Sequence, residues 1–424
     1  MARSRSLAVT AYAVVVAATV GAGWRWSPEL RGWPEPRMVT EAHFALNPND
    51  PVARQAIARD AAWVSAGRDP GAGTRWASMS HRALMDLRRL MTPDGAPPAG
   101  AGAGWGFFWP RDGAFVAVAL DRTGHPEEAR RIIDFTARLP FDARRGFDAR
   151  YQLGGGRVTQ LARGPQSDGC GWVLWALGMI RAAGGTALPA SAAGLRDYCV
   201  ANLMALTRDG GRMPPPSPDY WEVPVGSTSL GTVAPMLAGL RAASADYAAE
   251  GRDVAARASS RAADRLGAQV TMAFAPTYQR FGDSGGMDAG VAILMPPFSA
   301  EASPAVVARW EAYQRDARRS SGGLAPGAQW KQDGTSWTPE TALVAYTAAV
   351  SGRGGVAERW LDWLDQHRAA WGSLPEKVTR SGRTGGPAPL LWTVSLVLLT
   401  LSELQARGSA ASPRGSAPTG ASRM

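Results

Sequence analysis

The stretch Pro218-Asp219-Tyr220-Trp221-Glu222-Val223-Pro224 is the clearest break in a chain that otherwise has helical patterning. Proline fixes its own backbone torsion and has no amide hydrogen. This stretch and the proline-rich residues 213–217 before it therefore cannot form a helix or an interior strand. We expect a rigid loop that presents one carboxylate, Glu222, beside two aromatic rings. Taken alone, the loop fits a structural role, with Trp221 filling a gap in the core, as well as a chemical role for the acid.

Helical patterns flank this loop on both sides and account for most of the chain after residue 50. In residues 74–91, for example, apolar side chains recur at three- and four-residue spacing. Further helices are expected over residues 51–66, 114–122, 125–139, 167–183, 191–206, 228–243, 251–272, 288–294, 303–319, 339–350, 356–370 and 387–404. Short glycine-rich connections alternate with long ones that carry Trp, Asp, Glu and Pro. This alternation is typical of helical hairpins arranged in a ring, with the functional loops gathered at one end.

The composition limits the class of protein. Apolar residues make up 45% of the 424 residues, which is enough for a large buried core, and no long strand-rich segment suggests a separate β-domain. The net charge of +10 comes almost wholly from arginine, because Lys331 and Lys377 are the only lysines. These arginines are interspersed with acids and form no basic stripe, so nucleic acid is not an expected partner. The 17 tryptophans fit stacking on flat ligands, and they equally fit helix packing.

The N-terminal segment has the pattern of an export signal. Arg3 and Arg5 precede an apolar run over residues 7–23, which is short for a membrane span of about 20 residues. We therefore interpret residues 1–23 as a signal peptide or a membrane anchor, and expect a protein that is secreted or tethered to the outer face of the cell membrane. Residues 24–50 form a lead-in, 51–406 the helical domain, and 407–424 a disordered tail.

The two cysteines fit an exported protein and could form a disulfide. Cys170 begins one expected helix and Cys199 lies late in the next, so an antiparallel hairpin would bring them together. No cofactor and no metal are expected, because the four histidines are scattered and no phosphate-binding or dinucleotide-binding loop is present.

The first two long loops carry candidate binding residues. In Trp105–Asp112, four aromatic rings precede a charged pair at a helix start. Arg111 and Asp112 there could cap the helix and pair with each other, or they could bind sugar hydroxyls beside the ring of Trp109. In the second loop, Asp168 could cap the following helix or contact a ligand.

The other two loops each present a glutamate. Glu222 lies in the loop described above, and Glu376 follows Leu374-Pro375 near the last helix. Glu376 could simply be a solvated acid that pairs with Lys377. Two carboxylates from distant loops, each beside proline, also match the acid and base pair that hydrolyses a glycosidic bond.

The order of these motifs resembles that of the glucoamylase family, glycoside hydrolase family 15. The matching motifs run from Trp109-Pro110-Arg111-Asp112 through Gln166-x-Asp168-Gly169, Trp221-Glu222, Met287-Asp288-Ala289 and Leu374-Pro375-Glu376. The resemblance implies an all-α (α/α)6 barrel with an exo-acting, inverting site. It also implies a role for each matched residue: general acid for Glu222, general base for Glu376, a grip on the terminal glucose for Arg111 and Asp112, and a wall around that glucose for Trp109 and Trp221.

The sequence departs from the family pattern at three places. Val223-Pro224 follows the acid, Lys377 stands where glutamine is usual, and residues 327–333 lack the usual Arg-Tyr pair, so that only Asp333 and Lys331 could replace it. We expect an enzyme that releases glucose from the non-reducing end of α-glucosides or short α-glucans, linked α-1,4 or α-1,6, with an oligosaccharide as its partner. The alternatives are a carbohydrate-binding barrel that has lost catalysis and a relative that hydrolyses trehalose.

Overall fold

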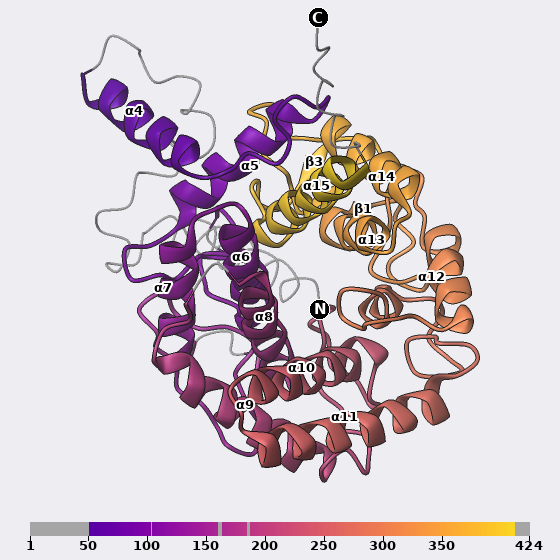
Figure 1. Ribbon diagram of the computed structural model, residues 1–424. Coiled ribbons are helices and arrows are strands. Elements are labelled where there is room, and N and C mark those ends of the chain that lie inside the picture. The colour runs from indigo at the N-terminus through magenta and orange to yellow at the C-terminus, as the bar shows by residue number, and fades with distance from the viewer. Residues whose placement is uncertain (1–50, 103, 160–162, 185–186, 412–424) are drawn as a thin grey trace, which may run out of the picture.

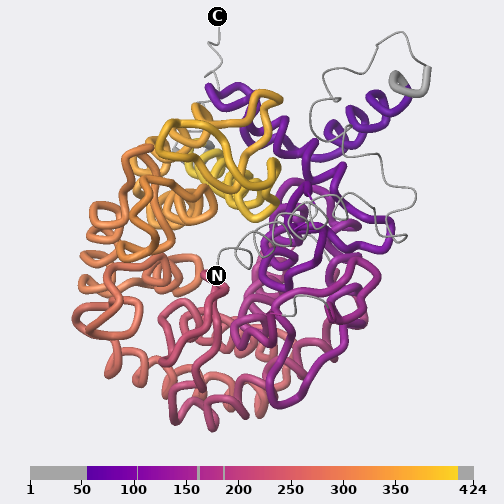
Figure 2. Tube along the Cα trace, turned by 180° about the vertical axis from the view of Figure 1, so that it is seen from behind, coloured from indigo at the N-terminus to yellow at the C-terminus, as the bar shows by residue number. Residues whose placement is uncertain are grey.

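Six inner elements form a ring in which each packs against its neighbour. The computed structural model describes residues 51–102, 104–159, 163–184 and 187–411. Around the ring follow α6 (Pro110–Arg122), α8 (Gly169–Ala183), α10 (Leu230–Ala249), the 3-10 helix η2 (Ala289–Leu294), α13 (Thr338–Val350) and α15 (Leu391–Ala411). The last of these packs against the first and closes the ring, as Figures 1 and 2 show from opposite sides. The (α/α)6 barrel expected from the sequence is confirmed.

Outer helices alternate with the inner elements along the chain and cover them. They are α5 (Ala77–Leu90), α7 (Pro126–Ala137), α9 (Ser191–Thr207), α11 (Asp253–Phe274), α12 (Pro304–Asp316) and α14 (Gly354–Gln366). The outer helix α14 buries a single stripe, Ala357, Trp360, Leu361 and Leu364, whereas the inner helix α13 is buried on every side. This difference follows from position, because an inner helix meets protein all round and an outer helix meets water on one face.

An additional helix, α4 (Pro51–Ala66), precedes the ring, packs against α5 and projects outward in Figure 1. In the described part of the chain, no helix combines the length and the apolar character that crossing a membrane requires. The expected signal or anchor over residues 1–23 and the lead-in over 24–50 lie outside the described residues.

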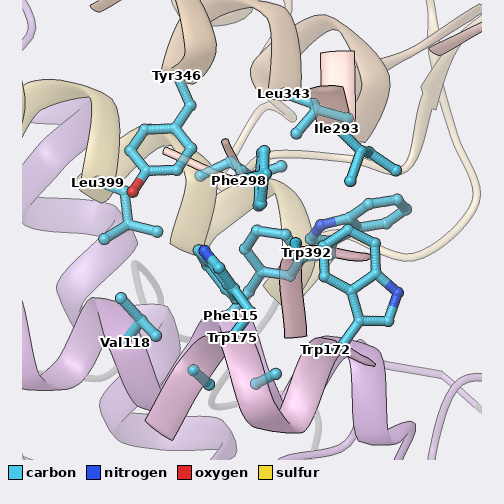
Figure 3. Packing of buried hydrophobic residues seen from close by; sticks show 14 of the residues in the cluster. Phe115, Val118, Trp172, Trp175, Ile293, Phe298, Leu343, Tyr346, Trp392 and Leu399 are labelled. Carbon is cyan, nitrogen blue, oxygen red and sulfur yellow. The ribbon is translucent and has the colours of Figure 1, made fainter. Parts of the chain in front are cut away.

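Aromatic side chains fill the centre of the ring (Figure 3). Phe115 of α6 lies 5.2 Å from Trp172 and 4.7 Å from Trp175, both on α8, measured between ring centroids. Trp175 in turn lies 5.1 Å from Phe298, which follows η2. Much of the tryptophan excess therefore serves helix packing, one of the two explanations that the composition allowed.

Some of the observed helix boundaries differ from the expected ones. Helix α6 begins at Pro110, so the Trp-Pro-Arg-Asp motif forms its first turn instead of preceding it. Helix α10 continues through Pro235 to Ala249, past its expected end at residue 243. Helix α15 starts at Leu391 and reaches Ala411, so residues 407–411 extend the helix and do not belong to a disordered tail.

A small antiparallel sheet that the sequence did not predict lies beside the fourth long loop. Strands β1 (Ser336–Trp337), β2 (Lys377–Val378) and β3 (Thr384–Gly385) pair in that order, with Trp337 opposite Lys377 and Lys377 opposite Gly385. The sheet joins the start of α13 to the loop that carries Glu376, and so connects two parts of the candidate site.

Candidate active site

The first turn of α6 contributes three candidate residues to one cluster. Trp109 is the N-cap residue, and its indole Nε1 donates a hydrogen bond of 2.7 Å to Oε1 of Glu222. The buried guanidinium of Arg111 pairs with Asp112 at 3.1 Å and lies 3.6 Å from Oε1 of Glu222. The helix start thus supplies an indole donor and a cation to the carboxylate of the central loop.

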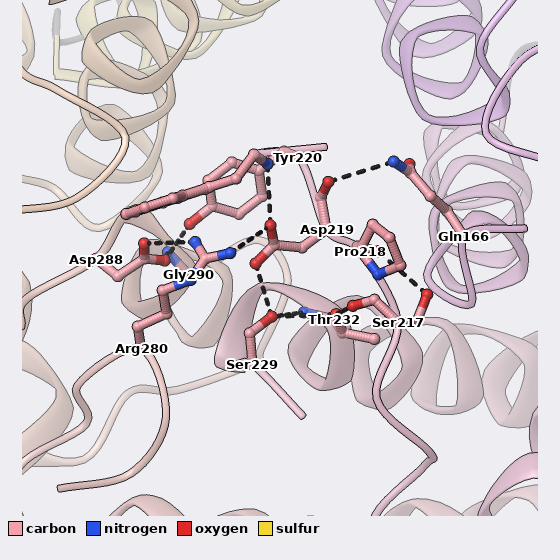
Figure 4. Close-up of polar contacts among 11 residues, drawn as sticks. Gln166, Ser217, Pro218, Asp219, Tyr220, Ser229, Thr232, Arg280, Asp288 and Gly290 are labelled. Carbon is pink, nitrogen blue, oxygen red and sulfur yellow. Dashed lines mark hydrogen bonds and ion pairs between the residues drawn. The ribbon is translucent and has the colours of Figure 1, made fainter. Parts of the chain in front are cut away.

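Hydrogen bonds to Asp219 stabilise the loop over residues 218–224 (Figure 4). The sequence had indicated no role for this residue. The Asp219 carbonyl accepts from the Glu222 amide at 2.8 Å, and its carboxylate accepts from the Trp221 amide at 2.9 Å. Ser229 at the start of α10 donates to the other carboxylate oxygen at 2.6 Å. These bonds close a tight turn in which Glu222 adopts a φ of +53°. Such a left-handed backbone is uncommon outside glycine, and among the described residues Arg208, Asp209 and Tyr278 also adopt it.

A second buried group anchors the same loop. Arg280 donates to Asp219 at 2.8 Å and to Asp288 at 3.2 Å, and the Tyr220 hydroxyl donates to Asp288. Burial raises the pKa of Asp288 to about 6, while the charge of Arg280 acts in the opposite direction. Arg280, Asp219 and Asp288 are almost fully buried, and together they hold the loop that carries Glu222.

Trp221 packs against Arg280 and Trp330. The Arg280 guanidinium lies over its ring, 3.6 Å from the centroid, and Trp330 meets it edge-on at 4.6 Å. One face of the ring is therefore occupied by a cation, so Trp221 can offer a sugar only its remaining surface.

Glu376 lies directly before β2 and is fixed through its backbone. Its backbone amide donates a hydrogen bond to the Pro387 carbonyl at 2.9 Å, and its backbone carbonyl accepts one from the Thr338 amide of α13 at 3.0 Å. Gly386 faces the side chain so closely that an added Cβ would lie 2.7 Å from the Cβ of Glu376, and its φ is +72°. Glycine is the residue that satisfies both conditions.

The electrostatic environment of Glu376 combines burial with positive charge. Burial raises the pKa of its carboxyl, whereas Lys377, Arg163 and a contact with Trp105 act to lower it. The Lys377 ammonium lies 3.2 Å from Oε2 of Glu376 and 4.4 Å from the centroid of the Trp337 ring. The pairing with Lys377 that the sequence suggested is therefore present, but the acid is buried and not a solvated loop residue.

Arg163 links the two glutamates. Its guanidinium forms an ion pair with Oε2 of Glu222, and its charge also acts on Glu376. Burial lowers the pKa of Arg163, and the nearby charges of Arg150 and Arg111 lower it further. The structure therefore brings Glu222, Glu376, Trp109, Arg111 and Asp112 into one cluster around a cation that the sequence analysis missed.

The remaining two binding candidates have other surroundings. Asp168 is buried and accepts from Nε1 of Trp172 at 3.0 Å, without making a side-chain cap to α8. Burial raises its pKa to about 6, and the charge of Arg111 opposes that shift. Asp333 lies in an exposed turn and accepts from the Thr335 amide at 2.9 Å. Asp168 thus bonds to a buried tryptophan of α8, and the hydrogen bond of Asp333 to Thr335 stays within its own turn.

The two cysteines lie together but are not bonded. Both Cys170 and Cys199 are buried free thiols, on α8 and α9. Burial and the neighbouring Cys199 raise the pKa of the Cys170 thiol. The antiparallel hairpin thus produces the proximity that the spacing predicted, without the disulfide.

Several buried polar atoms around the cluster have no hydrogen-bond partner among the described residues. They are Nη1 of Arg111, Nε1 of Trp221, Nε1 of Trp392 and Oε2 of Glu340. Buried polar groups in proteins are nearly always paired. In the described part of the chain, unpaired buried atoms also occur away from the cluster, among them Nε2 of His125 and Nε1 of Trp175.

Comparisons with known proteins agree with this architecture. No protein-family profile matches the chain, and no curated protein matches it by sequence. Among solved structures, a glycosidase in complex with glucose matches with a TM-score of 0.66 at 23% identity, over 77% of this chain and 96% of its own. A bacterial glucoamylase complexed with acarbose matches with a TM-score of 0.62 at 14% identity, over 81% of this chain and 57% of its own. A family 15 glucoamylase from Hypocrea jecorina matches with a TM-score of 0.59 at 14% identity, over 76% of this chain and 69% of its own.

The fold and the cluster together define a six-hairpin (α/α)6 protein with paired carboxylates at its loops. Within that class, the chain shares the fold of the glycosidase and of the family 15 glucoamylases across most of its length.

Proposed function

We propose that this protein is an inverting, exo-acting glycoside hydrolase that releases glucose from the non-reducing end of α-1,4- or α-1,6-linked oligosaccharides. The observation that carries the proposal is the convergence of Glu222 and Glu376 on Arg163, from loops far apart in the sequence. The shared fold supports it, because structures with this fold have been determined with glucose and with acarbose.

In the proposed reaction, each glutamate handles one proton. Glu376 takes a proton from a water molecule, whose oxygen attacks the anomeric carbon from the face opposite the leaving group. The bond to the glycosidic oxygen breaks, and that oxygen takes a proton from Glu222. One displacement inverts the anomeric centre, so an α-linkage yields β-glucose. Arg111 and Asp112 would bind hydroxyl groups of the terminal sugar.

This assignment requires a rearrangement at Glu222. In the structure Glu222 accepts from Trp109, contacts Arg163 and lies 3.6 Å from Arg111, so donors and cations already occupy its carboxyl oxygens. In the proposed reaction Arg163 withdraws before Glu222 protonates the glycosidic oxygen. The Arg163 side chain is 44% exposed, so an entering sugar could displace it into water.

The first experiment identifies the reaction. Purified protein is incubated with maltose, isomaltose, trehalose and maltoheptaose, and the released anomer is followed by NMR. Initial release of β-glucose supports inversion, and initial release of α-glucose contradicts it. The substrate that is cleaved identifies the linkage.

A second experiment separates acid from base. α-Glucosyl fluoride needs no acid, because fluoride departs without protonation. Glu222→Gln should lose about 10²–10⁴-fold in activity on an oligosaccharide while retaining activity on the fluoride, whereas Glu376→Gln should lose both. The exposed Glu127, whose side chain is 69% exposed, provides the control variant Glu127→Gln, which should lose neither. The opposite pattern would exchange the two roles.

The ion pairs also favour one alternative function. Each proposed catalytic carboxyl contacts a cation, Arg163 for Glu222 and Lys377 for Glu376, and this neutralisation is compatible with a carbohydrate-binding barrel that has lost catalysis. Such a protein would bind sugars in calorimetry but release no glucose from any substrate of the panel. Release from trehalose alone would favour the trehalose-hydrolysing alternative.

We also propose that the protein is exported, on the basis of the basic and apolar pattern of residues 1–23. Cell fractionation with a C-terminal tag tests this, and recovery of the tagged chain only from the cytoplasm would contradict it.

A further inference from the structure

Glu340 is a buried acid that the mechanism above does not use. It occupies the third position of α13, an inner helix that begins at Thr338, and its residue surface is 2% exposed. Its carboxyl accepts from its own backbone N–H, and Oε2 has no partner among the described residues. An acid in the first turn of a helix is usually solvated and interacts with the helix dipole, so burial at this position is unusual.

A backbone contact and nearby charges connect Glu340 with the candidate site. The same helix start holds Glu376, because the Thr338 amide donates to the Glu376 carbonyl at 3.0 Å. The charges of Arg111 on α6, Glu376 in the loop before β2 and Asp288 before η2 all act on the Glu340 carboxyl. Tyr313 of α12 is also within its electrostatic reach. Nη1 of Arg111 is likewise buried without a partner.

We propose that the Glu340 carboxyl hydrogen-bonds a hydroxyl group of a sugar bound between Arg111 and Glu376, and so helps to determine which sugar the site accepts. This inference rests on the proposed sugar-binding function of the same site. A buried polar atom without a partner is costly, and a ligand hydroxyl would satisfy Oε2. The arrangement differs from the Arg111–Asp112 pair, whose charges already satisfy each other at 3.1 Å.

The protonation state of Glu340 determines whether its carboxyl or the sugar hydroxyl donates the hydrogen bond. Burial raises the pKa of Glu340 to about 8, and the negative charges of Glu376 and Asp288 add to this effect against that of Arg111. The carboxyl is therefore neutral near pH 6 and can donate its proton to a hydroxyl oxygen. Above pH 8 it ionises beside the carboxylate of Glu376, and the donor is lost.

The test uses sugar binding, so that it does not depend on turnover. Affinities of the wild type, Glu340→Gln and Glu340→Leu are measured by calorimetry at pH 6 for glucose and for its 2-, 3-, 4- and 6-deoxy analogues. Glutamine keeps a donor of similar size, whereas leucine removes it. We expect Glu340→Gln to bind glucose within about threefold of the wild type and Glu340→Leu to bind it roughly tenfold more weakly.

The analogues distinguish a direct contact from a structural effect. If Glu340 contacts one hydroxyl, a single deoxy sugar binds the wild type and Glu340→Leu equally, while the other analogues retain the tenfold difference. Equal weakening for all five sugars, or no weakening for any, would overturn the proposal, as would a wild type that binds none of them.

A second measurement serves if the leucine variant does not fold. The affinity of the wild type for glucose should fall as pH rises through about 8, and Glu340→Gln should lose that dependence. An unchanged pH profile in Glu340→Gln would overturn the proposal. Failure to cleave oligosaccharides, by contrast, would contradict the proposed hydrolase and leave these binding results interpretable.

Discussion

Replacement of Arg280 by methionine tests whether the loop of Glu222 depends on its buried support. Arg280 bridges Asp219 at 2.8 Å and Asp288 at 3.2 Å, and it lies 3.6 Å from the centroid of the Trp221 ring. Both carboxylates have no exposed side-chain surface, and the arginine side chain is 2% exposed. Methionine keeps much of the packing and removes the charge and its hydrogen bonds.

The expected loss of stability arises because Arg280→Met leaves the buried carboxylates of Asp219 and Asp288 without their cation. Removal of one partner from a buried ion pair costs about 3–5 kcal/mol, because a charge is left without compensation. Asp288 can limit its share by taking up a proton. Its pKa is about 6 while Arg280 acts to lower it, so loss of Arg280 raises that pKa further and makes protonation at pH 7 easier. We therefore expect Arg280→Met to lower the free energy of unfolding at pH 7 by about 3–5 kcal/mol, and by less at pH 5.

Arg75 provides a matched control for this measurement. It also bridges two acids, Asp362 at 2.8 Å and Glu358 at 3.1 Å, and lies 4.0 Å from the centroid of the Trp76 ring, but its side chain is 55% exposed. Arg75→Met should cost less than about 1 kcal/mol in urea unfolding, because water screens the pairs. Similar small losses in both variants would refute the idea that the buried network supports the loop.

Three further outcomes are expected. Gly386→Ala should lower the free energy of unfolding by about 1–3 kcal/mol and reduce sugar release, because its Cβ would collide with Glu376. Arg163→Leu should move the acidic limb of the pH profile of kcat/KM to higher pH, because the lost cation no longer lowers the pKa of Glu376. Glu340→Gln should gain stability over the wild type as pH rises from about 4.5 to about 8, measured by urea midpoints. The folded wild type, with its raised pKa, holds a proton there that the unfolded chain releases.

The fold could be predicted because short stretches of the sequence contain the patterns that indicate it. Each hairpin has its own apolar periodicity, and the alternation of short and long connections indicated the ring. Among the helices, the differences lie mainly at the ends: α10 runs on to Ala249, and α15 spans Leu391–Ala411 instead of residues 387–404. The short helix expected over residues 288–294 is η2, Ala289–Leu294.

Prediction of the site was less complete. The two glutamates and the Arg-Asp pair were proposed from their distinctive neighbours in the sequence, and the structure places Glu222 close to Arg111. Arg163 sits two residues before the second of these loops, Pro165–Gly169, but many arginines are scattered along the chain and nothing distinguished this one. Glu340 resembles an ordinary first-turn acid of a helix. Its burial is a property of the ring, which no short window of sequence contains.

Side-chain exposure indicates which cation would move when a sugar enters the proposed site. Glu222 contacts Arg163, whose side chain is 44% exposed, and lies 3.6 Å from Arg111, whose side chain is 8% exposed. Arg163 can move into water, where its charge is solvated, although the Glu222 side chain itself is only 12% exposed. Withdrawal of Arg111 would leave Asp112 buried without a partner, at a cost of several kcal/mol. In the proposed reaction, Arg163 is therefore the residue expected to withdraw from Glu222, while Arg111 stays paired with Asp112.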